Sequence, residues 1–501
     1  MISAEGPPLQ RTGAVIDVMD GLPAALRSRG HEVCVALPFY REIRENRAFK
    51  KKDTGIAVDV QVGEKVYVAR YLEGRSASGV QLLLIRCDEF FDRDGIYGEH
   101  GKPYEDNASR FIFFCKATLE LSRRLTPQLQ VLHAHDWAAA LVPVFVRAQG
   151  LPFKTVLTIH HVADQGSFWG LDFGLTNLPE GFFSLNGVEF FGRLNFLKGG
   201  ILYADRITTV SEHYRREILT PSGGCGLDGV LGENAHRLTA ILDGADYNVW
   251  NPASDRLLPA RYDEKKLRGK QVCRDALLKE MKLAPGARGP VFGMVTRVVQ
   301  EKGFEILVPL LDRLLWDDVR LIILGQGDPA YETGLAVAAR KFSTRFAYKK
   351  DYDAKLAHLI EAGMDISLIP SQFEPAGLGA MYNLKYGALP IARATGGIHE
   401  IIEGYDPSSD SGYGFLCYEY SSEAFWDAMK RARQIFRDRE LWAKLMKRAW
   451  LRLATRLFLL TNVKVWRQKL LEASSTMLSQ MRILERLKLI RSQNLMLRRE
   501  C

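Results

Sequence analysis

The chain has 501 residues, of which 47% are hydrophobic and 25% are charged. This composition is typical of a folded globular protein and excludes a mainly disordered or collagen-like chain. The balance of 68 Lys and Arg against 59 Asp and Glu gives a formal net charge of +9. This mild excess suits anionic substrates, but it is too diffuse to indicate nucleic-acid binding.

Neither a membrane span nor a secretion signal is predicted, because the chain lacks both a run of about 18 uncharged apolar residues and a basic-then-apolar start. The seven cysteines are scattered and none forms a Cys-x-x-Cys pair. We therefore expect a reducing, cytoplasmic setting, with neither a zinc site nor a disulfide framework.

Short apolar runs alternate with helical patterns along most of the chain, which predicts parallel sheets covered on both faces by helices. The expected strands of the first half are residues 32–37, 80–85, 131–134 and 155–159. Those of the second half are residues 291–295, 319–324, 365–369 and 389–392. The apolar residues after Lys302 have helical spacing, with an expected kink or shortening of the helix at Pro309.

A segment rich in proline and charge, residues 251–288, separates the two groups of strands. We predict two doubly wound domains that face each other across a cleft, with their junction near residues 250–283. Ligands of such sheets bind at the carboxyl ends of the strands. The motifs that follow predicted strands are therefore the candidate functional residues.

The first of these motifs is His133-Ala-His-Asp-Trp137, at the end of a predicted strand. Two histidines and an aspartate could indicate a metal, but strand side chains alternate between two faces and no third cluster completes a site. A role of Asp136 as a carboxylate that contacts substrate is favoured. Residues 158–161, Thr-Ile-His-His, also end a strand, and His160 is either a site residue or a packed or capping histidine.

Two cations, Arg297 and Lys302, follow the predicted strand 291–295 and precede a helix. Fixed cations beside helix amides suit a diphosphate, although a solvated loop with two basic residues would have the same pattern. The Gly-rich turn at residues 324–328 follows the next strand and can serve simply to reverse the chain.

The turn at residues 370–378, Pro-Ser-Gln-Phe-Glu-Pro-Ala-Gly-Leu, leads from a strand into a helix. The backbone amides of Gly377 and Leu378 would lie near the helix N-terminus and favour an anion. Glu374 is placed to bond sugar hydroxyls or to stabilise developing positive charge. Thr395-Gly-Gly397 is another small-residue turn in the same half.

Together these motifs resemble the bacterial glycogen synthase and plant starch synthase family, the retaining glucosyltransferases of glycosyltransferase family 5. The resemblance covers roughly residues 3–470. It is carried, in order, by residues 11–17, 133–137, 158–160, 195–200, 209–211, 226–230, 246–252, 297–303, 325–328, 374–378 and 393–397. So many ordered motifs at consistent spacing make the assignment specific.

The resemblance implies a GT-B fold, with two Rossmann-like domains and a C-terminal helix that crosses back to the first. It implies an acceptor domain at 1–250, a nucleotide-sugar domain at 251–455 and a crossing helix at 456–474. Residues 475–501 have the pattern of a basic amphipathic helix, either an exposed extension or a surface for a membrane or for oligomerisation.

The implied reaction is transfer of glucose from ADP-glucose to the non-reducing end of an α-1,4-glucan, with retention and without metal or cofactor. The implied catalytic residues are Glu374, His160 and Asp136, the last two lining the sugar site. The implied donor-binding residues are Arg11, Asp17, Arg297, Lys302, Tyr352 (against the adenine), Gly377, Leu378, Thr395 and Gly396.

Several positions depart from the family pattern near this chemistry. The family Lys and Gly of the N-terminal loop are Arg11 and Ala14 here, and Ile16 stands where the family has Gly or Ala. The family Asn after His160 is His161, and a following aromatic is Asp164. Further departures are Asp243 for Asn, Asp351 for Gly beside Tyr352, where it would cost binding unless it points away or pairs with a lysine, and Ala376 for Cys.

The chain also has only residues 1–4 for the family's first strand. This predicts either a misassigned start, which we favour, or a first sheet that lacks a strand. A transit peptide could be hidden in this way, which would place a plant protein in the plastid.

Three functions remain open from the sequence. An active ADP-glucose-dependent synthase is favoured, because Arg297, Lys302, Tyr352, Glu374, His160 and Asp136 all survive. The alternatives are a glycosyltransferase with another donor, such as UDP-glucose, and a non-catalytic glucan-binding or regulatory protein. The expected partners are the nucleotide sugar and the glucan, with no nucleic acid and no membrane span, and with an oligomer possible through the tail.

Overall fold

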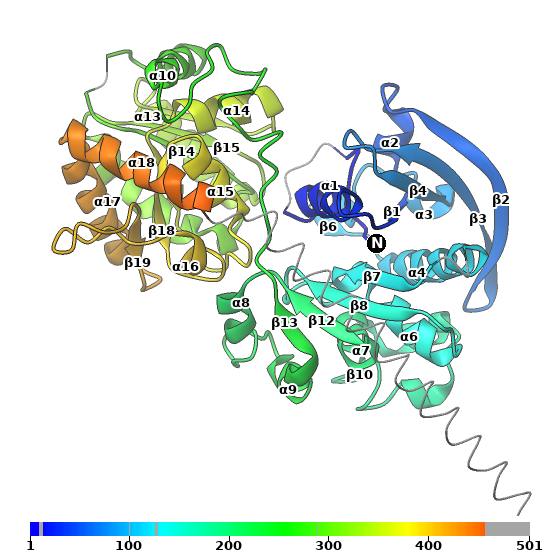
Figure 1. The fold of residues 1–501 in the computed structure, drawn as a ribbon. Helices are drawn as coiled ribbons and strands as arrows, with labels where there is room; N and C mark the ends of the chain where they lie inside the picture. The colour runs from blue at the N-terminus through cyan, green and yellow to red at the C-terminus, as the bar shows by residue number, and fades with distance from the viewer. Residues whose placement is uncertain (10–13, 100, 126–128, 287, 456–501) are drawn as a thin grey trace, which may run out of the picture.

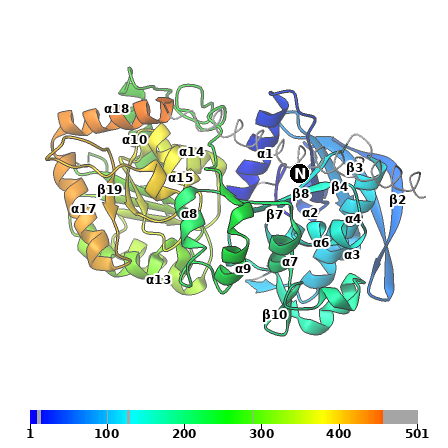
Figure 2. The same cartoon turned by 60° about the horizontal axis from the view of Figure 1, so that its bottom comes forward.

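The computed structural model describes residues 1–9, 14–99, 101–125, 129–286 and 288–455. The chain forms two α/β units that lie side by side (Figures 1 and 2). All described strands of the first unit's main sheet precede residue 241 and all those of the second follow residue 290. The predicted boundary at 250/251 lies between these two groups.

The first unit carries a large sheet flanked by helices (Figure 1). Its strands are β1 (Cys34–Pro38), β2 (Lys51–Val62), β3 (Lys65–Arg75), β4 (Gln81–Arg86), β7 (Val131–His135), β8 (Lys154–Ile159), β12 (Arg206–Thr209) and β13 (Leu238–Ala240). Its helices are α1 (Ala14–Arg27), α2 (Arg41–Glu45), α3 (Asp88–Phe91), α4 (Asn107–Arg124), α5 (Asp136–Ala139), α6 (Leu141–Ala148), α7 (Phe196–Tyr203), α8 (Glu212–Glu217) and α9 (Asp228–Glu233).

The sheet of the first unit consists of two four-stranded parts, ordered β13-β12-β8-β7 and β1-β4-β3-β2. Ile2 lies between them and forms parallel bridges to Ala134 in β7 and Ala36 in β1. The Ile2 amide donates to His133 O at 2.8 Å and its carbonyl accepts from His135 N at 2.9 Å. Residues 1–4 therefore occupy the position between the two parts through isolated bridges rather than as a regular strand, and the start of the chain stays a prediction.

The second unit has a six-stranded, wholly parallel sheet. Its strands are β14 (Val291–Val295), β15 (Arg320–Leu324), β16 (Phe346–Lys349), β17 (Ile366–Ile369), β18 (Leu389–Arg393) and β19 (Phe415–Cys417). Its helices are α10 (Arg268–Glu280), α11 (Phe304–Leu307), α12 (Leu311–Leu315), α13 (Pro329–Lys341), α14 (Ala354–Gly363), α15 (Leu378–Lys385), α16 (Ile398–Ile401), α17 (Ser422–Phe436) and α18 (Arg439–Thr455).

The strand order of this second sheet is β16-β15-β14-β17-β18-β19. In chain order this is 3-2-1-4-5-6, the order of the Rossmann fold, whose ligands bind where the order reverses. The reversal lies between β14 and β17. The loops after these two strands carry Arg297 with Lys302 and Glu374 respectively, so the topology places these predicted site residues together.

The eight predicted strands are all present, each displaced by no more than two residues at an end. The helix after Lys302 is interrupted as expected, because a 3-10 turn at Val308–Leu310, which contains Pro309, separates α11 from α12. The hairpin of β2 and β3 was not predicted, since its side chains are mostly exposed or half-buried and give no continuous apolar run.

The predicted crossing helix (456–474) and basic tail (475–501) lie outside the described residues. Within the part that the structure describes, no helix combines the length and the apolar character needed to cross a membrane.

Candidate active site

A cleft of about 1080 Å³ lies between the two units, at the carboxyl ends of their parallel strands. Both units contribute to its walls. Of the predicted site residues, those that line it are Asp17, Asp136, His160, Arg297, Lys302, Tyr352, Glu374 and Leu378. The cleft therefore brings together predicted site residues that are up to 361 positions apart in the chain, counted from Asp17 to Leu378.

Lys302 and Glu374 form an ion pair in the lining of the cleft. Lys302 Nζ donates to Glu374 Oε2 at 2.8 Å, and the two side chains are only 15% and 18% exposed. Ser371 Oγ donates to the same carboxylate oxygen at 2.9 Å. A partly desolvated carboxylate held by two donors is fixed in position, and Glu374 Oε1 is left to accept from a ligand.

Arg297 belongs to a chain of charges that crosses the cleft. Its Nη2 donates to Glu301 Oε1 at 2.5 Å, and the other oxygen of Glu301 lies 3.4 Å from His161 Nε2 of the first unit. His161 Nδ1 lies 3.1 Å from Asp164 Oδ2. Burial opposes protonation of His161, but Asp164 and Glu301 outweigh it and raise the pKa of His161. His161 and Asp164, two of the departures from the family pattern, therefore contact each other, and His161 also contacts Glu301 of the second unit.

Asp136 opens α5 directly after β7 with a left-handed backbone, φ 54°. Its Oδ1 accepts from the His160 amide at 2.7 Å and the His161 amide at 3.3 Å, so it ties the ends of β7 and β8 together. Burial raises the pKa of Asp136 to about 7, although these amides act in the opposite direction. The carboxyl group thus changes charge near neutral pH.

Replacement of Asp136 by asparagine is expected to flatten the pH dependence of stability. A folded pKa near 7 against an ordinary value of 3.8 means that Asp136 favours folding below pH about 4, and that this contribution is lost as the pH rises to about 7. Asparagine keeps an acceptor oxygen, tolerates a left-handed backbone and cannot ionise. The free energy of unfolding, measured with urea, should fall between pH 4.5 and pH 8 by on the order of 3 kcal/mol less in the variant than in the unmodified protein. Parallel curves for the two proteins would contradict the assignment.

His160 is buried, and burial lowers its pKa to about 4, which keeps the ring neutral. Its Nε2 lies 3.0 Å from His135 Nδ1, and its Nδ1 lies 3.8 Å from Asp243 Oδ2. His133 and His135 lie on one side of β7 with their rings 4.1 Å apart, and His133 contacts Thr158. Among the described residues no group of three or more His, Cys, Asp or Glu is arranged to hold a metal ion.

Asp17 and Tyr382 form a direct hydrogen bond between the two units. Tyr382 Oη in α15 donates to Asp17 Oδ2 in α1 at 2.8 Å. Burial raises the pKa of Asp17 to about 6, and this hydrogen bond acts in the opposite direction. Asp17 is therefore held at the interface between the units, at the edge of the cleft that Tyr352 also lines.

Three of the remaining predicted donor residues are described by the structure but are not part of the cleft lining. Thr395 Oγ1 and the Gly396 amide both donate to Glu217 Oε1 of α8, at 2.9 and 3.1 Å. Gly377 is left-handed at the start of α15, and the residues after it, Leu378 to Ala380, reach the cleft. Gly377, Thr395 and Gly396 do not line the cleft themselves, and Arg11 lies outside the described residues. Their binding of the donor stays a prediction.

The comparisons with known proteins agree over nearly the whole chain. The starch synthase catalytic domain model matches residues 1–233, and the group 1 glycosyl transferase model matches residues 279–449. A glycogen synthase of Opitutus terrae is 41% identical over 457 residues, which cover 90% of this chain and 95% of that protein. A glycogen synthase of Koribacter versatilis is 38% identical, over a region that covers 89% of this chain and 92% of that protein. The chain belongs to the glycogen and starch synthase family.

The fold agrees with this family. The catalytic domain of starch synthase IV from Arabidopsis thaliana, solved with ADP and acarbose bound, superposes with a TM-score of 0.87 at 28% identity. It covers 95% of this chain and 98% of that structure. The predicted GT-B architecture of two Rossmann-like domains is thereby confirmed, and the chain is a glycosyltransferase.

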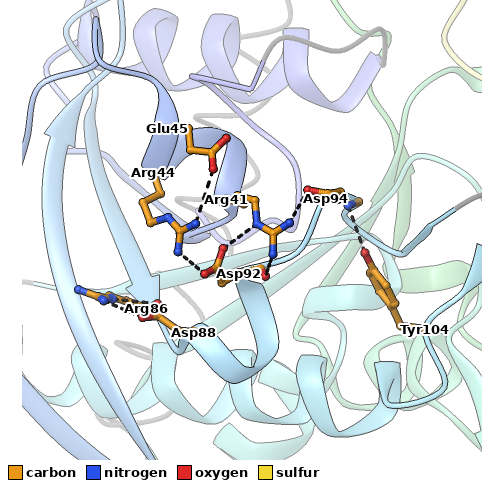
Figure 3. Close-up of polar contacts among 9 residues, drawn as sticks. Arg41, Arg44, Glu45, Arg86, Asp88, Asp92, Asp94 and Tyr104 are labelled. Carbon is orange, nitrogen blue, oxygen red and sulfur yellow. Dashed lines mark hydrogen bonds and ion pairs between the residues drawn. The ribbon is translucent and has the colours of Figure 1, made fainter.

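One wall of this synthase's cleft was not predicted from the sequence. It is formed by residues 96–98 and 101–103, from the short strands β5 (Gly98–Glu99) and β6 (Lys102–Pro103) and the residues next to them. Arg41 anchors the preceding loop through Asp92 at 2.8 Å and Asp94 at 2.6 Å, and Arg44 also pairs with Asp92 (Figure 3). Tyr104 Oη accepts from the Gly95 amide at 3.2 Å. Clustered Arg and Asp in residues 41–44 and 92–94 were the available signal.

Asp351, the acidic departure next to Tyr352, is exposed and does not line the cleft. Its carboxylate is therefore not part of the cleft wall that Tyr352 lines, and Lys350 pairs with Glu332, at 2.8 Å. Ala376, by contrast, does line the cleft.

Proposed function

We propose that this synthase transfers glucose from ADP-glucose to the non-reducing end of an α-1,4-glucan with retention of configuration. The observation that carries the proposal is the Lys302–Glu374 pair at the reversal point of the second sheet, with Arg297 beside it. His160 and Asp136 of the first unit line the same cleft. The relative solved with ADP and acarbose supports a nucleotide and a glucan-like ligand in this cleft.

Each group has a chemical role in the proposal. Arg297 and Lys302 stabilise the negative charge that develops on the departing diphosphate. Glu374, freed from Lys302 when the diphosphate binds, accepts from the hydroxyls of the donor glucose. Neutral His160 and the Asp136 carboxyl line the sugar site, where burial of the reactants between the two units excludes water.

The test is purified protein incubated with glycogen and either ADP-glucose or UDP-glucose, with nucleoside diphosphate release and glucan extension measured together. Extension with ADP-glucose, at a kcat/KM at least about tenfold above that with UDP-glucose, is expected. Extension with UDP-glucose alone would contradict the donor, and glycogen binding without turnover of either would contradict catalysis.

Glu301→Gln is expected to lower the KM for ADP-glucose about two- to fivefold, the value of a partly exposed ion pair. Glu301 holds Arg297, and its charge opposes an anionic donor. Glutamine releases the arginine and removes the repulsion. Glu305→Gln is the control, because Glu305 lies in α11 but does not line the cleft. A KM that is unchanged or raised in Glu301→Gln would show that Arg297 does not exchange this partner for the donor.

The nucleotide sugar and the α-glucan are the substrates in this proposal. An oligomer through residues 475–501 and a cytoplasmic location stay predictions. The absence of a cofactor also stays a prediction. In it, ADP-glucose is a substrate that the reaction consumes.

A further inference from the structure

A small antiparallel sheet lies at the rim of the cleft in the first unit. Its strands are β9 (Ser167–Trp169), β10 (Glu189–Phe190) and β11 (Arg193–Asn195), in the order β10-β11-β9. Residues 165–168 line the cleft, so β9 begins inside it and runs outward. The outer part of this small sheet therefore continues the surface of the cleft.

One face of this small sheet gathers aromatic and basic side chains. Ser167 and Trp169 are two residues apart on β9 and share a face. Arg193 lies directly opposite Trp169, and Phe190 is directly opposite Arg193. The Arg193 guanidinium donates to Ser167 Oγ at 3.0 Å and to Ser167 O at 3.1 Å, which lays it along the strand between the cleft and Trp169.

Two large aromatic side chains of this region are unusually exposed. Trp169 is 65% exposed, and Phe191, in the turn between β10 and β11, is 84% exposed. A Cβ on Gly170 would lie 2.5 Å from Gly192 O, so the chain next to Trp169 packs against the chain next to Phe191. The Phe191 ring contacts the Phe190 ring edge-on, with centroids 4.6 Å apart, and so lies beside the face that carries Arg193 and Trp169. Exposed apolar groups that gather in one patch, rather than singly, mark interaction or ligand-binding sites.

We propose that this face, formed by Trp169, Phe191 and Arg193, binds a segment of the α-glucan chain outside the catalytic cleft. Sugar rings present apolar C–H faces that stack on aromatic rings, and hydroxyl groups that accept from a guanidinium. The occupant follows from continuity, because the face begins at the cleft that the chain end enters. The inference rests on the proposed function for the identity of the polymer.

The first measurement is direct binding, by retardation of the protein in native gels that contain glycogen. The variant carries Trp169→Ala and Phe191→Asn, since asparagine tolerates the left-handed φ of 50° at that turn. We expect the dissociation constant for glycogen to rise about tenfold. Trp316→Ala is the matched control, because Trp316 is 71% exposed in the other unit. Equal retardation of the variant and the unmodified protein would overturn the proposal.

Kinetics separate this face from the catalytic site. The KM for glycogen should rise about tenfold in the double variant, while kcat and the KM for maltotriose stay unchanged. An equal rise with both acceptors would overturn the proposal, since it would place the two side chains in the catalytic subsite. If the unmodified protein turns over no donor, the proposed function fails, and the native gel alone then tests whether this face binds glycogen. Retardation that is lost in the double variant supports the face, and a lack of retardation of the unmodified protein overturns it.

Discussion

Lys302→Ala is expected to lower kcat/KM for glucose transfer by a factor of about 10²–10³, the usual cost of removing one preorganised donor from a site of developing charge. Lys302 Nζ lies 2.8 Å from Glu374 and faces the cleft beside Arg297. Alanine leaves the departing diphosphate without this cation and leaves Glu374 with Ser371 as its remaining donor. Initial rates at varied ADP-glucose measure the effect.

The matched control is Lys341→Ala. Lys341 also pairs with a carboxylate, Asp312, at 2.6 Å, but its side chain is 49% exposed on α13 and does not line the cleft. A change in rate of no more than about twofold is expected, because exposed ion pairs contribute little. Lys302→Ala with a rate equal to that of the control would show that the chemistry does not occur at this pair.

Gly303→Ala is expected to destabilise the fold by at least about 3 kcal/mol, because two penalties act together. Gly303 has a left-handed backbone, φ 79°, which costs other residues about 1–2 kcal/mol. A Cβ at this position would also lie 2.1 Å from Pro370 O, which a real Cβ does not tolerate. The loops after β14 and β17 must then separate, and Lys302 moves away from Glu374. Urea unfolding and initial rates measure the two consequences.

Gly229→Ala provides the control for this substitution. Gly229 lies in α9, and a Cβ added there would meet no atom within 4 Å outside its own helix turn, while alanine favours helix by about 0.5–1 kcal/mol. We expect an unchanged or slightly higher unfolding free energy and a normal rate. If Gly303→Ala proved as stable and active as Gly229→Ala, the close approach of the two loops would not be needed to build the site.

Much of the fold was predictable, because most of its parallel strands are buried on both faces and appear as continuous apolar runs. Residues 291–295 and 365–369 are examples, and both became strands of the second sheet. The break at Pro309 followed from the missing amide and fixed φ of proline. The hairpin β2–β3 was not predictable in this way, since burial along it follows tertiary contact with α4 rather than a local pattern.

The candidate site was predictable in its parts. Arg297, Lys302 and Glu374 each follow a predicted strand, and the family resemblance supplied the roles. The contacts between them were not, because Lys302 and Glu374 are 72 positions apart and Asp17 and Tyr382 are 365 apart. The packing of Thr395 and Gly396 against Glu217, and the contact of His161 with Glu301, were equally hidden.

The sequence by itself determined the α/β class, the two-unit division of strands and the family, since these depend on local periodicity and on motifs in a fixed order. Only the tertiary structure decided which charges meet. Parallel strands that are distant in the chain end at one edge of a sheet, and two such edges face each other across the cleft. The pKa of each ionisable group, and the energy of its interactions, depend on burial and on nearby partners. Both come from packing between residues that no short stretch of sequence brings together.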